Sequence, residues 1–251
     1  MDDLDLLIDL HRDAKRQGPG GNNETRFAIT LSGLTGGQGL KIADIGCGTG
    51  ASTLVLAQEL DAHITAVDSL PEFLEQLDIA AKREDVGERI KTLAASMEAL
   101  SFEGRSFDAI WSEGAIYNMG FENGIREWRQ FLKPGGILAI SELTWLTRER
   151  PFELEQYWMR EYPEVATASA KIAILEANGY SPVGYLALSE RCWLDNYYRP
   201  MQARFADFLS RNGHSEPAQA LVDGEEKEIA LYERFSAFFS YGYFVARRTA
   251  D

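Results

Sequence analysis

Cysteine and histidine are scarce in this chain of 251 residues. The two cysteines, Cys47 and Cys192, are too few and too far apart for a disulfide framework or a cysteine-based zinc site. The three histidines, His11, His63 and His214, show no metal-ligand spacing. We therefore expect neither a disulfide scaffold nor a metal centre.

Long apolar runs and basic runs are also absent. No apolar run exceeds four residues, whereas about 20 are needed to span a bilayer. The first residues read Met-Asp-Asp-Leu-Asp, acidic where a signal peptide is basic, so we expect a cytoplasmic protein. The net charge is -14, and no run of Lys or Arg exceeds two residues. Nucleic acids and anionic membranes are therefore poor candidate partners.

What remains is the composition of a folded domain, with 45% hydrophobic and 25% charged residues. Short apolar runs alternate with helical patterns between residues 40 and 141, as in a doubly wound α/β fold with a parallel sheet. The predicted strands are 40–45, 64–67, 90–94, 107–111, 137–140, 180–188 and 241–248. The predicted helices are 3–16, 24–34, 53–60, 72–82, 125–132 and 167–178. Ligands are expected at the carboxyl ends of the parallel strands.

The whole chain, 1–251, is predicted to form a single α/β domain with a mostly parallel, seven-stranded sheet. Its parts are an N-terminal helical cap (1–39), the core sheet (40–189 and 240–251) and a helical insertion (190–239) between strands six and seven. Helices are expected at 200–211 and 217–239 of the insertion. The insertion could cover a pocket or form a dimer surface, and a homodimer remains one of the oligomeric states open.

A glycine-rich segment, DIGCGTG at residues 44–50, lies where the first strand ends and the first crossover helix begins. Alternate glycines permit a sharp turn and let a ligand approach the backbone closely. Asp68 ends the second strand, 18 residues after Gly50. A carboxylate at this distance can accept hydrogen bonds from both ribose hydroxyls of a nucleoside. The two features together predict a nucleoside cofactor.

NAD is one alternative, because Gly46, Gly48 and Ala51 also satisfy the G-x-G-x-x-G/A pattern. Three features point elsewhere: a third glycine at Gly50, Asp44 two residues before the first glycine, and a strand, insertion and strand in place of a second mononucleotide-binding half. Asp44 would repel a pyrophosphate but suits an ammonium group. An NAD-linked oxidoreductase and a non-catalytic nucleoside-binding module remain the alternatives.

Residues 44–50 resemble the first motif of the class I S-adenosylmethionine-dependent methyltransferases. Val67-Asp68 resembles the acidic end of strand two in that family, and LKPGG at 132–136 resembles the turn into strand five. RQGPG at 16–20, WSEGAIYN at 111–118 and ERP at 149–151 are similar to a subgroup of bacterial small-molecule methyltransferases. The resemblance implies that S-adenosylmethionine donates a methyl group to a small-molecule acceptor by in-line displacement.

The resemblance also implies a set of cofactor contacts. They are the loop Gly46, Cys47, Gly48 and Gly50 around the ribose and methionine portion, Asp44 near the ammonium group, Asp68 at the ribose diol, Ser69 and Leu70 beside the adenine, Ser96 and Met97 at its edge and face, and Ser112 near the methionine end. Many family members carry Asp at the position of Ser96. Cys47 is expected to be present for its small size.

Methyl transfer needs mainly alignment and exclusion of water, and it needs a base only if the nucleophile arrives protonated. Glu113 and Tyr117 are the candidates for substrate contact or proton removal, and Gln17, Asn118 and Trp145 are candidate substrate or lid residues. Each has a structural alternative. Glu113 could be solvated, Tyr117 packed, and Asp68 a helix N-cap, while His11 is expected to be packed or on the surface.

Overall fold

One sheet forms the centre of the molecule, of which the computed structural model describes residues 3–250. Its strands are β1 (Leu40–Ile45), β2 (Ala62–Asp68), β3 (Ile90–Ala94), β4 (Phe107–Glu113), β5 (Leu132–Trp145), β6 (Ala166–Thr167), β7 (Tyr180–Ala187) and β8 (Phe239–Arg248). The order is β3-β2-β1-β4-β5-β8-β7, and the short β6 pairs with β5 off this path. β8 runs antiparallel to β5 and β7, whereas the other pairs are parallel. The predicted mostly parallel α/β sheet is confirmed, with β6 as an added strand.

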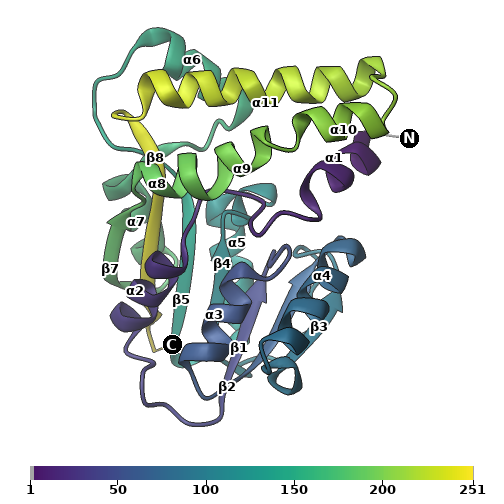
Figure 1. Cartoon of the computed structure of the whole chain (residues 1–251). Coiled ribbons are helices and arrows are strands. Elements are labelled where there is room, and N and C mark those ends of the chain that lie inside the picture. Colours follow the sequence, from purple (N-terminus) through teal and green to yellow (C-terminus); the bar gives the residue numbers. More distant parts are fainter. Residues whose placement is uncertain (1–2, 251) are drawn as a thin grey trace.

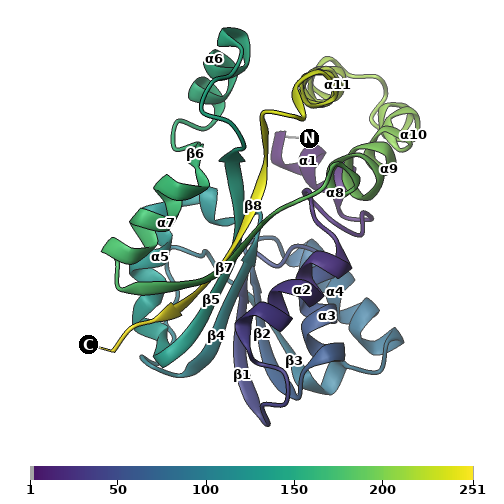
Figure 2. The same ribbon diagram turned by 90° about the vertical axis from the view of Figure 1, so that its left-hand side faces the viewer.

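Helices cover both faces of this sheet. The α-helices are α1 (Asp3–His11), α2 (Asn22–Ser32), α3 (Ala51–Glu59), α4 (Pro71–Arg83), α5 (Phe121–Trp128), α6 (Phe152–Glu161), α7 (Ala168–Ala177), α8 (Glu190–Trp193), α9 (Arg199–Gln202), α10 (Phe205–Arg211) and α11 (Glu216–Phe235). Short 3-10 turns are η1 (Gly87–Arg89), η2 (Ile116–Asn118) and η3 (Arg129–Phe131), and η4 (Leu194–Tyr198) is a π-helical turn. Figure 2 shows α2, α3 and α4 on one face and α5 and α7 on the other.

The central strands are apolar on both faces because helices bury both. In β1, the last four residues are all buried, and Ile42 and Ile45 belong to the cores on opposite faces of the sheet. β1 lies between β2 and β4, so the strand order runs from β1 toward β3 at one edge of the sheet and from β4 through β5 toward the other edge. Such a switch point opens a crevice at the carboxyl ends of the strands.

The helical insertion α8–α11 lies over this crevice together with α1 (Figure 1). α1 packs against both α10 and α11. The cap over the strand ends is therefore built from two segments that are about 200 residues apart in the chain. None of the helices within residues 3–250 has the length and apolar character needed to cross a membrane.

Several predicted boundaries are wrong. The first helix ends at His11 and not at residue 16, and the helix predicted at 217–239 ends at Phe235 because Phe239 already pairs with Trp145 of β5. The helix predicted at 125–132 is α5, which starts at Phe121 and ends at Trp128. β5 continues to Trp145, since antiparallel pairing with β8 holds its second half. The helix α6 and the strand β6 were not predicted.

Candidate active site

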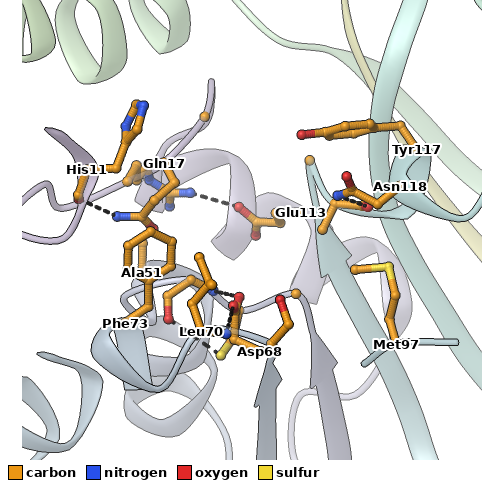
Figure 3. Close-up of a pocket in the computed structure, with 18 of the residues that line it drawn as sticks. His11, Gln17, Ala51, Asp68, Leu70, Phe73, Met97, Glu113, Tyr117 and Asn118 are labelled. Atoms are coloured by element: carbon orange, nitrogen blue, oxygen red, sulfur yellow. Dashed lines mark hydrogen bonds and ion pairs between the residues drawn. The ribbon is translucent and has the colours of Figure 1, made fainter. Parts of the chain in front are cut away.

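A cavity of about 600 Å³ lies at the carboxyl ends of β1, β2 and β4, beneath α1 and α11. This volume is within the range of roughly 300–1,000 Å³ usual for small-molecule sites. Asp68, Leu70 and Phe73 lie on one side of it, and His11 and Tyr117 face each other across another part (Figure 3). A single cavity is therefore bounded by the sheet, the N-terminal segment and the insertion.

The glycine-rich loop after β1 forms part of the wall. Gly46 and Gly48 have φ angles of 72° and 54°, in the left-handed region that favours glycine. A Cβ on Gly46 would lie 2.3 Å from the Cβ of Ala115, and one on Gly48 would lie 2.2 Å from Oε1 of Gln17. Backbone is thus exposed to the cavity at positions where a side chain would not fit.

Asp68 lies at the tip of β2 and holds this loop in place. Its Oδ2 accepts a hydrogen bond from the Gly48 N–H at 2.8 Å, and its Oδ1 accepts one from the Leu70 N–H at 3.0 Å. Burial raises the pKa of Asp68 above its usual value, while these backbone hydrogen bonds lower it. The carboxylate still lines the cavity, so its remaining lone pairs can accept hydrogen bonds from a ligand. The alternative role of Asp68 as a helix N-cap is wrong, because the N-cap of α4 is Leu70.

Asp44 is not a wall residue, contrary to its predicted place beside the ligand. It is fully buried behind the loop, where Oδ2 accepts hydrogen bonds from the hydroxyls of Ser52 at 2.7 Å and Thr53 at 2.6 Å. Its Oδ1 has no hydrogen-bond partner within residues 3–250. Burial raises the pKa of Asp44 to about 7. The glycine cradle and the Asp68 carboxylate, which do line the cavity, fit a nucleoside cofactor.

This raised pKa predicts a pH-dependent stability for the cofactor-free protein. In the unfolded chain Asp44 ionises near its usual value of 3.8, whereas in the folded protein it keeps its proton up to about pH 7. Its contribution to stability is therefore lost as pH rises through this window. Between pH 5.5 and 8.0 the wild type should lose about 2 kcal/mol relative to Asp44→Asn. Urea unfolding at both pH values measures the difference, and parallel pH profiles for the two proteins would refute it.

The N-terminal segment after α1 is fastened to the glycine-rich loop. The Gln17 side chain donates a hydrogen bond to Thr49 Oγ1 at 3.0 Å and accepts one from the Thr49 N–H at 3.0 Å. Thr49 Oγ1 also donates to the carbonyl oxygen of Ala14 at 2.9 Å. Gln17 lines the cavity, which agrees with a place in its cover. The amide oxygen and nitrogen of Gln17 are both hydrogen-bonded within the protein.

Glu113, at the end of β4, has no free oxygen. Its Oε1 accepts hydrogen bonds from Thr25 Oγ1 at 2.7 Å, Trp111 Nε1 at 3.1 Å and the Tyr243 hydroxyl at 3.0 Å. Its Oε2 pairs with Arg16 Nη1 at 2.9 Å, and both side chains are less than a tenth exposed. A carboxylate with four donors is poorly placed to remove a proton from a substrate. Glu113 serves instead as a junction between the sheet and the N-terminal segment.

Most other predicted positions line the cavity. They are Cys47, Ser69, Leu70, Ser96, Met97, Tyr117 and Asn118. Burial, followed by the nearby carboxylates of Asp44 and Asp68, raises the pKa of the Cys47 thiol well above its usual value. The thiol is therefore neutral and inert, as a small wall residue should be. Tyr117 is 46% exposed, and its ring packs edge to face against that of Tyr162, with centroids 6.2 Å apart.

Three further predicted residues do not reach the cavity. Ser112 is fully buried and follows Ile110 on the sheet face covered by α5 and α7. Trp145 is in the opposite core against Phe239, and the Arg150 guanidinium stacks on its ring at 4.3 Å. Gly50 precedes α3 and faces Leu77, since a Cβ there would lie 2.2 Å from Leu77 Cδ1. The sequence placed all three near strand ends, but it did not fix the side-chain directions of Ser112 and Trp145 or the orientation of the backbone at Gly50.

The structure adds wall residues that the sequence did not predict. His11 of α1, Tyr197 of η4, and Glu225 and Glu228 of α11 line the part of the cavity under the insertion. The rings of His11 and Tyr197 are stacked with centroids 6.4 Å apart, and His11 Nε2 lies 3.9 Å from Glu225 Oε1. The only local signal was the spacing of three between the two glutamates, which puts them on one helix face. The insertion thus covers the pocket.

Comparison with protein families gives a match to a methyltransferase domain over residues 42–136. A demethylmenaquinone methyltransferase of Corynebacterium glutamicum (strain R) is 32% identical over 182 residues, which cover 71% of this chain and 69% of that protein. The 27-O-demethylrifamycin SV methyltransferase of Amycolatopsis mediterranei is 26% identical over 220 residues, covering 85% and 78%. The chain spans only 28% of a matching sterol 24-C-methyltransferase of Gibberella zeae.

Solved structures share the fold over nearly the whole chain. An S-adenosylmethionine-dependent methyltransferase from Geobacter sulfurreducens, in complex with S-adenosyl-L-homocysteine, superimposes with a TM-score of 0.85. The alignment covers 97% of this chain and 98% of that one at 16% sequence identity. The helical cap as well as the sheet is therefore common to the two folds.

Proposed function

Since this chain belongs to the class I S-adenosylmethionine-dependent methyltransferases, we propose that it transfers a methyl group from S-adenosylmethionine to a small-molecule acceptor. When bound, this cofactor supplies a methyl group on a positively charged sulfur. In-line displacement then requires alignment of the acceptor and exclusion of water, more than a dedicated base. Two of the relatives named above act, by their names, on demethylmenaquinone and 27-O-demethylrifamycin SV.

One observation carries the proposal: the glycine-rich loop and Asp68 share a single cavity with a second group of side chains under the insertion. The loop side can hold a nucleoside, as the Asp68 carboxylate and the exposed backbone at Gly46 and Gly48 suggest. The insertion side leaves room for an acceptor. A cofactor and an acceptor could therefore meet without solvent between them.

We assign the residues accordingly. Asp68 would accept hydrogen bonds from the ribose hydroxyls, and Ser69, Leu70, Ser96 and Met97 would border the adenine. The loop of Gly46, Cys47 and Gly48 would pass under the methionine portion. Asp44 would contact the cofactor only indirectly, by accepting a hydrogen bond from Ser52, which does line the cavity. Gln17 would close the N-terminal segment over the cofactor, and Tyr117 and Asn118 would contact the acceptor.

Calorimetry tests this proposal against its alternatives. We expect S-adenosylhomocysteine to bind at micromolar concentration or below and NADH not to bind. Tight NADH binding without any response to S-adenosylhomocysteine would overturn the proposal in favour of an oxidoreductase. A coupled assay for homocysteine release across a metabolite library then tests turnover. Cofactor binding with no turnover on any member would instead favour a non-catalytic nucleoside-binding module.

A further inference from the structure

The part of the cavity under the insertion is acidic. α11 presents Glu225 and Glu228 there, one helical turn apart. In residues 3–250, no lysine or arginine lies within 4.0 Å of either carboxylate. The contacts they do have are the Tyr198 hydroxyl, which donates to Glu228 Oε1 at 2.8 Å, and His11 Nε2, 3.9 Å from Glu225. Two carboxylates thus face the cavity without a cationic lysine or arginine.

His11 adds a ring nitrogen without a hydrogen-bond partner to this end of the cavity. The residue is only 5% exposed, and its Nδ1 has no hydrogen-bond partner among the residues described. The other ring nitrogen, Nε2, lies 3.9 Å from Glu225 Oε1. A buried polar atom without a partner is costly, so a donor from a ligand would relieve it. Two carboxylates and one ring nitrogen match the three N–H donors of an ammonium group.

Aromatic rings complete the same surroundings. Tyr197 stacks on His11, and Tyr117 lies on the other side of the cavity with its hydroxyl directed toward the His11 side (Figure 3). Tyrosine faces attract cations through the ring quadrupole. Burial, followed by the neighbouring Glu225, raises the pKa of Glu228 to about 7. A bound cation would offset both effects.

An anionic acceptor has no matching group in the cavity. Among residues 3–250, the wall carries five carboxylates, those of Asp68, Glu98, Glu113, Glu225 and Glu228, against the single arginine Arg16. Arg16 is already paired with Glu113 at 2.9 Å. A carboxylate or phosphate on the acceptor would therefore meet repulsion without a free positive partner.

We propose that the methyl acceptor carries an ammonium group, which Glu225, Glu228 and His11 bind under the insertion. This inference rests on the proposed methyl transfer and narrows its substrate to small amines. The tyrosines form the walls around the aliphatic or aromatic body of the acceptor. Glu225 and Glu228 bind the acceptor and are different residues from those assigned to the cofactor.

The test uses the full-length protein saturated with S-adenosylhomocysteine and sets of ligands that share one skeleton. Each set contains an amine, the alcohol and the carboxylate, beginning with phenethylamine, 2-phenylethanol and 3-phenylpropanoate and continuing with their cyclohexyl and straight-chain counterparts. Calorimetry should show amines binding at least tenfold more tightly than the matched alcohols, with no carboxylate binding. Equal affinity for amines and alcohols across all sets would overturn the inference, as would tighter binding of carboxylates.

Variants assign the preference to α11. The double variant Glu225→Gln, Glu228→Gln should bring amine affinity down to that of the alcohols, whereas Glu226→Gln, an exposed charge on the same helix, should change it less than twofold. Affinity for S-adenosylhomocysteine should stay within twofold in all variants, which also reports on folding. An amine preference that survives the double variant, or an equal loss of cofactor affinity, would refute the assignment. Failure of the wild type to bind S-adenosylhomocysteine would instead defeat the proposed function itself.

Discussion

Replacing Asp68 with alanine should weaken the binding of S-adenosylhomocysteine at least about 100-fold. A hydrogen bond to a charged group contributes about 1.5–3 kcal/mol, and Asp68 would accept two from the ribose, while each 1.4 kcal/mol corresponds to about tenfold in affinity. The same carboxylate holds the Gly48 N–H at 2.8 Å, so the loop also loses its anchor. The lost ribose hydrogen bonds and the lost loop anchor both affect the part of the cavity that is assigned to the cofactor.

Titration calorimetry measures this effect, and Asp108→Ala is the matched control. Asp108 also accepts a backbone hydrogen bond, from the Lys41 N–H at 2.9 Å, and pairs with Lys133 at 2.7 Å. It lies at the amino end of β4, away from the cavity. Its removal should alter S-adenosylhomocysteine affinity less than twofold. If Asp68→Ala binds within threefold of the wild type, the carboxylate does not hold the cofactor.

The cofactor half of the site was predictable because neighbouring parallel strands set it. The glycine-rich loop directly follows β1 and Asp68 ends β2, and the two strands pair in register, with Ile45 opposite Val67. Strand direction alone therefore brings the loop and the carboxylate together. The predicted mostly parallel sheet follows from the same local alternation of strands and helices.

Side-chain direction near strand ends was less predictable. Ser112 and Glu113 are adjacent in β4, but only Glu113 points to the cavity, because successive residues of a strand face opposite sides. Trp145 looked close to the site because β5 was expected to end at residue 140. The strand continues through antiparallel pairing with β8, which carries Trp145 into the core beside Phe239. Pairing with a distant strand leaves no local mark in the sequence.

The acceptor half depends on contacts between distant segments. His11 meets Glu225, and Glu113 meets Arg16, Thr25 and Tyr243, across as many as 214 residues of chain. The helical periodicity of the insertion predicted its helices but not which face of α11 would lie over the strand ends. Glu113 illustrates the result: its position after β4 suggested chemistry, whereas its contacts are structural.

Glu113→Ala should therefore lower the free energy of unfolding by about 3–5 kcal/mol, the usual cost of leaving one member of a buried ion pair unpaired. The change strands the Arg16 guanidinium, which is 9% exposed, and removes the acceptor of the Trp111 and Tyr243 donors. For a domain of this length the melting temperature should fall by about 10 °C. Denaturant unfolding and thermal scans measure both quantities.

Two comparisons separate this structural role from a catalytic one. Glu59→Ala breaks an exposed pair with Arg26, in which both side chains are at least 40% exposed, and should cost less than about 1 kcal/mol. Arg16→Ala combined with Glu113→Ala removes both buried charges and should recover part of the loss. If Glu113→Ala instead retains wild-type stability and S-adenosylhomocysteine affinity but loses methyl transfer, Glu113 acts on the acceptor itself. Because four donors hold this carboxylate, we expect the reverse: Glu113→Ala should mainly lower stability. Turnover should fall only to the extent that the N-terminal segment around Arg16 loosens over the cavity.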